Sequence, residues 1–232
     1  MKNSDFIITL AWPQGMVESA NAWYDSLLLR ILRYIPRRKL SKNGQYRVGH
    51  SALILVNSES KKLHYMDFGR YQTPVDFGRV RDAETDPDIG ISILAKIKHD
   101  NITNVNDILI EIANNEATHG EGVLYASLLR GVNFNKSFSF AKQMQEKGAI
   151  SYGPFVRKGS NCSRFVSKII RKSGISIYKR CRLKIQANIT PSPKRNVSIS
   201  NSNFYKVENN NCIKITRNKI KAYFIDIEKE NV

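Results

Sequence analysis

A β-hairpin is the feature that most constrains how this chain folds. Residues 48–56 are dense in β-branched and aliphatic side chains, as buried strands are, and the polar residues 57–62 have the composition of a turn. Residues 63–68 then alternate in character and end at Gly69, which is typical of a returning strand. An antiparallel hairpin within residues 46–69 brings polar residues from both strands side by side, so a functional site is sought there first.

The pattern before the hairpin adds one strand and one helix. Residues 6–12 are apolar and predict a buried strand; a secretory segment is the alternative, although Asp5 precedes the run and Pro13 interrupts it. Apolar residues at helical spacing predict an amphipathic helix over 19–34. Because the chain mixes these elements and contains no internal repeat, the expected class is α+β.

The pattern after the hairpin turns mostly helical. We interpret residues 88–148 as a helical insertion, with candidate helices at 108–117, 122–129 and 137–147. A further helix is expected over residues 162–172, because turn-forming residues precede it and Gly174 follows it. Strand-like segments close the chain at 212–216 and 220–227.

The chain has the size and composition of one domain. Its 232 residues can bury one substantial core, and no stretch resembles a flexible linker, so a single domain over 1–232 is expected. No apolar run approaches the roughly 20 residues of a membrane-spanning helix. The three cysteines cannot all pair with each other and match no zinc spacing, which favours free thiols in a reducing compartment. We therefore expect a cytoplasmic protein, with secretion as the alternative.

Positive charge gathers in the last third of the chain. The formal net charge is +17, and residues 148–205 contain twelve lysines and arginines but no aspartate or glutamate. The basic C-terminal segment 173–232 is therefore expected to present a positive surface. Two interpretations stay open: an anionic partner such as a nucleic acid, or a solvated basic surface without a specific partner.

Cys162 is the candidate nucleophile. Ser160 and Asn161 are both good N-cap residues, which places Cys162 in the first turn of the following helix. Unpaired N–H groups and the positive end of the helix dipole favour a thiolate there, and the same N–H groups can stabilise an oxyanion. The alternative is a buried cysteine that acts only as a small apolar residue. Cys181 and Cys212 have no comparable caps.

His50 is the candidate base, because an imidazole early in an apolar strand is costly unless it has partners. If the turn centres near Glu59, Asp67 lies across the hairpin and can orient the imidazole ring, as the third member of a catalytic triad does. His64 has the wrong register for that role unless the strand is bulged. The alternatives are a structural histidine at position 50 and a surface carboxylate at position 67.

These segments carry a family resemblance. A strand that opens with Gly49-His50-Ser51-Ala52, a polar residue on its partner strand, and a much later helix that starts at Asn161-Cys162-Ser163 resemble the permuted papain-like superfamily. That superfamily includes NlpC-type peptidases, YiiX-like amidases and lecithin:retinol acyltransferase-like enzymes, and histidine precedes cysteine in its permuted members. The resemblance covers residues 46–172. It implies an antiparallel sheet that carries the histidine and packs against the helix that starts at the cysteine.

The resemblance implies an amide or ester hydrolase, or an acyltransferase, that forms a thioester and uses neither a metal nor an organic cofactor. Cys162 would be the nucleophile, His50 the base and Asp67 the third member, with His64 as the competing choice. Tyr152 precedes the cysteine, as does a tyrosine near the oxyanion site in many relatives. Asn161 and Ser163, the polar neighbours of the thiol, are further candidates for oxyanion or substrate binding. The long basic segment and the inserted middle region depart from the family pattern, so the substrate stays open.

Two other segments are candidate sites. Arg79 and Arg81 belong to a charged stretch after the hairpin that either lines a cleft with recognition groups or, as we favour, forms a solvated loop. The segment 118–122 contains His119 and Glu121 among glycines, and we interpret it as a helix boundary since no second ligand pair lies nearby. No glycine-rich nucleotide motif is present. The main alternative to an enzyme is a polyanion-binding or nucleic-acid-binding protein built on an inactive papain-like scaffold.

Overall fold

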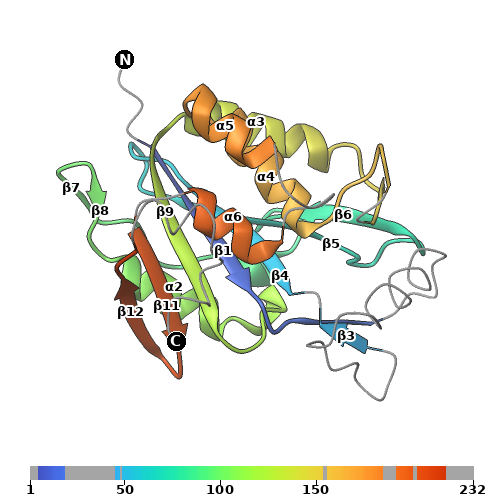
Figure 1. The fold of residues 1–232 in the computed structure, drawn as a ribbon, viewed down its shortest axis with the longest axis horizontal. Helices are drawn as coiled ribbons and strands as arrows, with labels where there is room; N and C mark the ends of the chain where they lie inside the picture. Colours follow the sequence, from blue (N-terminus) through green and yellow to red (C-terminus); the bar gives the residue numbers. More distant parts are fainter. Residues whose placement is uncertain are drawn as a thin grey trace.

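An antiparallel sheet with helices on both faces forms the centre of the molecule (Figure 1). The structure is a computed structural model, and it describes residues 5–18, 45–47, 49–153, 156–184, 192–200 and 203–217. All strand pairs in the main sheet are antiparallel, and its strand order is β10-β6-β5-β4-β1-β9-β11-β12. Two smaller ribbons pair β2 with β3 and β7 with β8.

The strands have the following bounds: β1 (Asp5–Trp12), β2 (Met16–Glu18), β3 (Gln45–Arg47), β4 (His50–Val56), β5 (Leu63–Gly69), β6 (Phe77–Arg81), β7 (Ile97–Lys98), β8 (Asn101–Ile102), β9 (Leu124–Val132), β10 (Ile150–Ser151), β11 (Asn203–Glu208) and β12 (Asn211–Ile215). The helices are α2 (Val105–Asn114), α3 (Phe134–Gln145), α4 (Cys162–Lys172), α5 (Ile177–Lys184) and α6 (Pro193–Ser200), with 3-10 turns η1 (Pro87–Ile89) and η2 (Glu116–Thr118).

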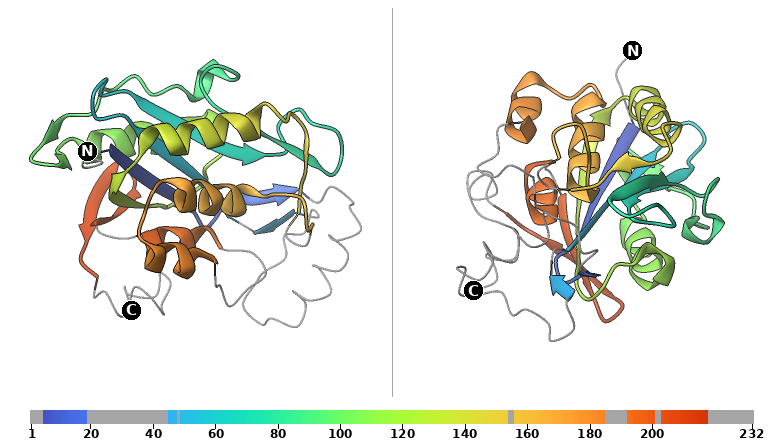
Figure 2. Two further views of the ribbon diagram at one scale, coloured as in Figure 1. Left: turned by 90° about the horizontal axis from the view of Figure 1, so that it is seen from above. Right: turned by 90° about the vertical axis from the view of Figure 1, so that its right-hand side faces the viewer.

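The sheet separates two hydrophobic cores. Alternate residues of β4 point to opposite faces: Ala52, Ile54 and Val56 pack toward α2, whereas Leu53 and Leu55 pack toward α3 and α4. Both views in Figure 2 show α2 on one side of the sheet and α3 and α4 on the other. Helix α6 covers β1 and β9 on the side of α4. Because both faces are covered, the central strands are buried along almost their whole length.

The expected hairpin and the helix after it are present in the structure. Strands β4 and β5 pair with Val56 opposite Leu63 and Ala52 opposite Asp67. Helix α4 begins at Cys162 and ends at Lys172, the bounds expected from the sequence. The strand expected over 6–12 is β1, which is buried at the middle of the sheet. The antiparallel sheet and the helices around it confirm the expected α+β class.

The helical insertion expected over 88–148 is partly wrong. Helices α2 and α3 lie near two of the predicted positions, but the segment 122–129 contributes to strand β9, which pairs with β1 in the middle of the sheet. Strand β9 is apolar on both faces because it is covered on both sides, so it shows no alternation that would mark it as a strand. The helix expected over 19–34 and the strand over 220–227 lie outside the described residues.

No helix in the described part of the chain is long and apolar enough to cross a membrane.

Candidate active site

Cys162 is the first residue of α4, and hydrogen bonds fix the loop that precedes it. The side chain of Asn161 caps the helix by accepting a 2.8 Å hydrogen bond from the Arg164 backbone N–H. The Arg164 guanidinium in turn donates to the carbonyl oxygens of Val156 and Gly153, at 2.8 and 3.3 Å. Helix geometry leaves the N–H groups of the first turn without intrahelical partners, so the cap places the thiol beside free donors and the positive end of the dipole.

The backbone of Ser163 is held by a second element, helix α6. Its carbonyl oxygen accepts a 2.8 Å hydrogen bond from the side chain of Asn196 on α6, and both residues are buried. The Ser163 hydroxyl lies 3.9 Å from the Cys162 sulfur. Two elements separated by about thirty residues therefore fix the start of α4, and the Ser163 hydroxyl adds a weak contact to the thiol.

His50 is the first residue of β4, and the chain turns sharply just before it. Gly49 has φ of +76°, and a Cβ atom there would lie 2.9 Å from the Trp12 carbonyl oxygen, so only glycine fits without strain. The imidazole stacks on the Trp12 indole, with ring centroids 5.7 Å apart and an interplanar angle of 28°. A Cβ atom on Gly120 would meet that indole at 2.2 Å, so the loop after η2 crosses directly over it. These close contacts set the position of the His50 ring.

Asp67 is fully buried and is the most heavily hydrogen-bonded group near His50. Its carboxylate accepts hydrogen bonds from His50 Nε2 at 3.2 Å, from the Tyr65 and Tyr71 hydroxyls at 3.2 and 2.9 Å, and from Arg81 Nε and Nη2 at 3.1 and 2.8 Å. Register explains the His50 contact, since Asp67 lies opposite Ala52 and thus diagonally opposite His50 on the same face. Four side chains from three strands and one loop converge on one carboxylate.

The cysteine and the histidine approach from opposite faces of the sheet. His50 and Asp67 belong to the face covered by α2, whereas α4 packs on the other face through Phe165 and Val166. The Cys162 side chain contributes to raising the pKa of His50, so the sulfur lies near the imidazole ring. Since Nε2 is engaged with Asp67, Nδ1 is the ring nitrogen left for the sulfur. Cys162 and His50 therefore meet at the end of the sheet where β4 begins.

The charges of the cluster support one another. Burial acts to lower the pKa of His50, but hydrogen bonds to Asp67 and Cys162 outweigh it and raise that pKa to about 9. Burial likewise acts to raise the pKa of Asp67, and the hydrogen bonds from His50 and Arg81 bring it down to about 2. At neutral pH the ring is therefore an imidazolium and the carboxylate is ionised. An imidazolium beside a thiol favours the thiolate, which is the nucleophilic form.

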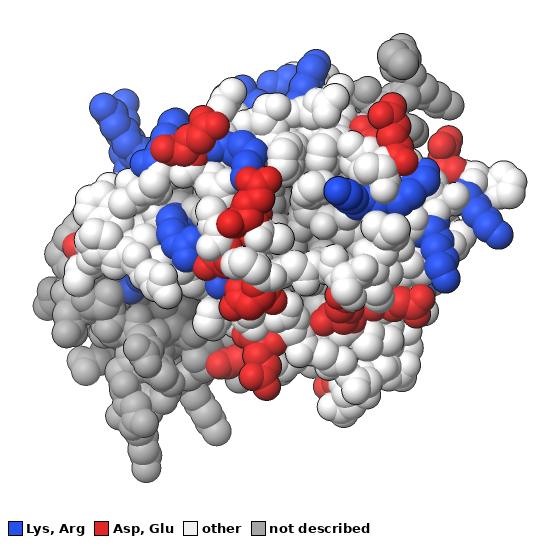
Figure 3. Space-filling view, turned by 180° about the vertical axis from the view of Figure 1, so that it is seen from behind, with Lys and Arg blue, Asp and Glu red and all other residues white. Residues whose placement is uncertain are grey.

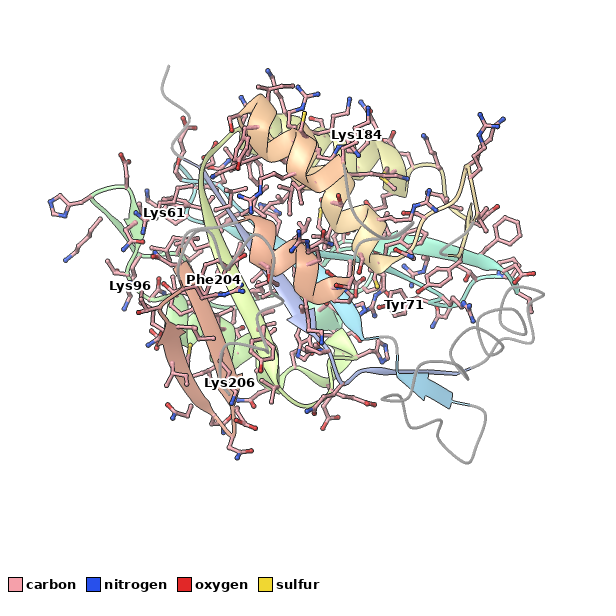
Figure 4. All side chains as sticks on the ribbon, in the orientation of Figure 1. Lys61, Tyr71, Lys96, Lys184, Phe204 and Lys206 are labelled. Atoms are coloured by element: carbon pink, nitrogen blue, oxygen red, sulfur yellow. The ribbon has the colours of Figure 1, made fainter. Side chains whose placement is uncertain are left out.

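Tyr71 and His119 also belong to this neighbourhood, although sequence reasoning did not select them. The Tyr71 hydroxyl donates to Asp67, and its ring stacks on His119 with centroids 5.4 Å apart. Burial and then the nearby Asp67 charge raise the pKa of Tyr71 well above its usual value, and the charge of Cys162 adds to this. Tyr71 therefore lies within electrostatic range of the sulfur, near the start of α4 (Figure 4).

The two arginines assigned to a charged stretch are not in a solvated loop. Arg79 and Arg81 lie in strand β6, and the prediction of a loop is wrong because their partners neutralise them within the fold. Arg81 is 3 % exposed and faces Asp67, so it lies inside the structure and not at the surface of a cleft. Arg79 pairs with Asp86 through two contacts of 2.6 Å. Arg81 thus joins the candidate site, whereas Arg79 stabilises the turn that follows β6.

His64 and Tyr152 are placed differently from His50. The His64 ring packs against Phe134 and Phe138 of α3, on the opposite face of β5 from Asp67. The strand is regular here, with Leu55 opposite His64, so the bulge that would bring His64 to His50 is not formed. Tyr152 stacks on Phe68, with centroids 5.8 Å apart, and lies under the Arg70 guanidinium. The structure therefore brings together Cys162, His50 and Asp67 and leaves His64 outside.

Within the described ranges, no three or more histidine, cysteine, aspartate or glutamate side chains are grouped so as to hold a metal ion. The segment 118–122 was interpreted as a boundary, and His119 does end η2 in a left-handed conformation with φ of 54°.

Comparisons with known proteins agree with this architecture. A family model described as type VI secretion system effector TseH-like matches residues 7–179. The crystal structure of the type VI secretion system effector TseH superposes with a TM-score of 0.63 at 20 % sequence identity, over 91 % of this chain and 98 % of that one. At that identity the likeness concerns the fold. No curated protein sequence matches the chain.

Proposed function

Because the chain belongs to the TseH-like family of type VI secretion system effectors, we propose that it is an effector enzyme, a thiol-dependent hydrolase or acyltransferase acting on an amide or ester bond. The observation that carries the proposal is the buried chain of contacts from Asp67 through His50 to Cys162 at the start of α4. The permuted papain-like order, with histidine before cysteine, fits the same assignment. An effector of a secretion system acts away from its site of synthesis, so the expected cytoplasmic location applies to the chain before export.

The reaction follows from the positions of these groups. The Cys162 thiolate attacks the carbonyl carbon, a C–S bond forms, and the carbonyl π electrons move to oxygen, where N–H groups of the first turn of α4 stabilise the charge. Collapse of this intermediate re-forms the carbonyl and breaks the bond to the leaving group, which takes the proton from the His50 imidazolium. A thioester remains. Water or another acceptor then gives its proton to His50, attacks the thioester and releases the thiolate.

Asp67 has an orienting role in this scheme. Its carboxylate keeps His50 Nε2 as a donor, so Nδ1 exchanges the proton with the sulfur and the leaving group. The Asn161 side chain is committed to capping α4, so we assign it to presenting the thiol and not to substrate contact. Tyr152 stays a candidate for the oxyanion side through its position before the cysteine helix. No step requires a metal or an organic cofactor.

Alkylation by iodoacetamide tests the nucleophile. Cys162 is only 6 % exposed, while Cys181 is exposed, so accessibility alone predicts faster labelling of Cys181. The proposed activation predicts the reverse at pH 7, with Cys162 modified at least about tenfold faster, measured by peptide mapping over time. Cys212 should react most slowly, because burial raises its pKa to about 11. Equal slow modification of all three thiols contradicts the proposal.

A matched pair of variants separates activation of the Cys162 thiol from its accessibility to iodoacetamide. His50→Gln removes the imidazole but retains a polar side chain of similar reach, so it should bring the Cys162 rate down to or below that of Cys181. His64→Gln changes a histidine on the other face of β5 and should leave the Cys162 rate unchanged. A fall in the His64 variant instead of the His50 variant would reassign the base.

A polyanion-binding function is the second candidate, and one observation favours it. The described part of the stretch 148–205 places Arg171 and Lys172 at the end of α4 and Arg180 and Lys184 on α5, and that stretch of sequence contains no acidic residue. The face seen from behind the view of Figure 1 carries both basic and acidic side chains (Figure 3). A basic stretch of this kind attracts phosphates in a strongly salt-dependent way.

Titration with DNA and RNA at about 50 and 200 mM salt tests this second function. Binding should weaken at least about tenfold between the two salt concentrations, and Arg180→Gln with Lys184→Gln should weaken it further. The variants Lys96→Gln and Lys98→Gln, on a different part of the surface, provide the control of equal charge. No binding at the lower salt concentration removes this candidate and leaves the enzyme proposal intact.

A further inference from the structure

Arg81 lies directly opposite Asp67 in the sheet. The register of β5 and β6 pairs the two residues, so their side chains project from the same face. Nε and Nη2 of the guanidinium approach the two carboxylate oxygens at 3.1 and 2.8 Å, as a two-pronged fork. The side chains are 4 % and 0 % exposed. Such a fork fixes both the distance and the rotation of the carboxylate, and the rotation decides which oxygen faces His50.

The same guanidinium holds two other segments. Nη2 also donates to the Ala117 carbonyl oxygen at 3.1 Å, which ties η2 to the strands. The guanidinium carbon lies 3.4 Å from the centre of the Tyr71 ring, and the Tyr71 hydroxyl donates to Asp67. His119, two residues beyond Ala117, stacks on the same tyrosine. Strand β6, the loop after β5 and the turn after α2 thus meet at one side chain.

We propose that Arg81 is a positioning residue of the candidate active site, which fixes the Asp67 carboxylate against His50 and binds Tyr71 and η2 into the same buried cluster. This inference rests on the function proposed above. The charges of the site also balance. With His50 protonated and the sulfur ionised, the positive charges of His50 and Arg81 match the negative charges of Asp67 and Cys162. Arg81 therefore allows the imidazolium and thiolate to coexist with a buried carboxylate.

Lysine at position 81 separates geometry from charge. Lysine keeps the positive charge but offers no planar fork and no flat face for Tyr71, so Asp67 gains freedom to rotate. The groups facing His50 are Asp67 and Tyr65 on β5, Tyr71 in the following loop, Arg81 on β6, His119 after η2, and Cys162 on α4. Arg81→Lys changes only one of these groups and leaves their total charge unchanged.

NMR titration of the His50 ring in the full chain measures the effect. In Arg81→Lys the pKa of His50 should fall from about 9 by about one pH unit, because the hydrogen bond to a less constrained Asp67 weakens. Arg79→Lys is the comparison variant, since Arg79 lies on the same strand but binds Asp86 through Nη1 and Nη2 and the Tyr71 carbonyl oxygen through Nε, without touching Asp67; the pKa of His50 should move less than in Arg81→Lys. A folded Arg81→Lys chain with an unchanged His50 titration overturns the proposal.

A double-variant cycle tests whether Arg81 acts through Asp67. In an Asp67→Asn background, Arg81→Lys should produce no further change in the titration of His50. An equal shift in both backgrounds overturns the proposal. If Arg81→Lys does not fold, Arg81→Gln can be combined with Asp67→Asn, which neutralises both members of the buried ion pair. The His50 ring of this double variant should titrate at the same pH as that of Asp67→Asn alone. A different midpoint overturns the proposal.

The titration does not depend on catalysis, so the two proposals can fail separately. If Cys162 shows no enhanced alkylation in the unaltered chain, the proposed function falls while the Arg81 cycle still reports on positioning. If the enzyme hydrolyses p-nitrophenyl acetate, Arg81→Lys should lower kcat about tenfold with KM unchanged, and Arg79→Lys should lower kcat less. A rise in KM with constant kcat would place Arg81 in substrate binding and overturn its positioning role.

Discussion

Cys162 and Asp67 belong to one site, but they are held in different ways. Asp67 is fully buried and accepts hydrogen bonds from His50, Tyr65, Tyr71 and Arg81, whose donors come from strands and a loop far apart in sequence. Cys162 is positioned by the local start of α4, and its sulfur has a single weak contact with Ser163 besides its interaction with His50. We call these two parts the orienting half and the thiol half.

Because of this difference, substitutions in the thiol half should lower activity alone, whereas substitutions in the orienting half should also lower stability. Removing a group from the orienting half leaves buried partners unpaired, which costs stability as well as alignment. Removing the sulfur leaves the helix start and its cap intact, so the fold should tolerate it. The comparison teaches that the reactive atom of this site, although buried, makes few polar contacts, whereas its orienting carboxylate is heavily hydrogen-bonded.

Cys162→Ser gives the largest expected effect and tests the thiol half. Activity toward an ester substrate should fall about ten-thousandfold or more, because the alkoxide needed from serine is far less accessible than a thiolate. Thermal unfolding should change little, since serine fills nearly the same volume and keeps the cap of α4. Cys181→Ser, at an exposed position, is the control and should retain full activity. Loss of the fold in Cys162→Ser would remove the distinction between the halves.

Asp67→Ala tests the orienting half. The Arg81 guanidinium would stay buried without its counter-ion, so the free energy of unfolding should fall by about 3–5 kcal/mol in urea titrations. Asp86→Ala removes the carboxylate partner of Arg79, whose side chain is 21 % exposed, and should cost about 1 kcal/mol or less. Similar losses in the two variants would show that Asp67 is no more important to the fold than the partly buried Asp86.

Acylation and alkylation should respond differently to pH. The pKa of His50 is raised to about 9, so the imidazolium that donates a proton to the leaving group is present below pH 9 and lost above it. The kcat/KM for amide or ester cleavage should therefore fall about tenfold per pH unit above 9. Alkylation of Cys162 by iodoacetamide needs no proton donor and should not fall. Parallel pH profiles for the two reactions would contradict the assigned role of His50.

Tyr71→Phe should give the smallest effect. It removes one hydroxyl from Asp67 but keeps the ring between Arg81 and His119, so a loss of about 1 kcal/mol in unfolding free energy and a severalfold fall in kcat are expected. Tyr205→Phe, a tyrosine on β11 outside the site, should leave kcat unchanged and serves as the control. An unaltered kcat in Tyr71→Phe would restrict the orienting half to the charged pair.

The thiol half could be predicted from the sequence, because its geometry is local. The N-cap at Asn161, the cysteine after it and the glycine that follows the helix define α4 within a dozen residues. The hairpin with His50 and Asp67 was also predictable, since turn length fixes its register within narrow limits. The fold class follows from the same two elements.

The remainder depends on contacts between distant segments. Arg81 and Tyr71 look like surface residues in the sequence, and only the pairing of β5 with β6 brings them onto Asp67. Strand β9 resembles a helix because its neighbours bury both of its faces. One signal was available for Arg81: Arg79 and Arg81 alternate with Val80 in a short strand-like run, so the two arginines would share one face of a strand. Nothing local distinguishes it from a solvated loop.

The stack of Trp12 on His50 gives the molecule an optical reporter. A protonated imidazole in contact with an indole quenches its fluorescence, and the two rings lie 5.7 Å apart. Emission from Trp12 should therefore brighten as the ring loses its proton. Replacing the second tryptophan, Trp23, by phenylalanine leaves one emitter in the chain. The turnover of this site could then be followed by light, without a labelled substrate.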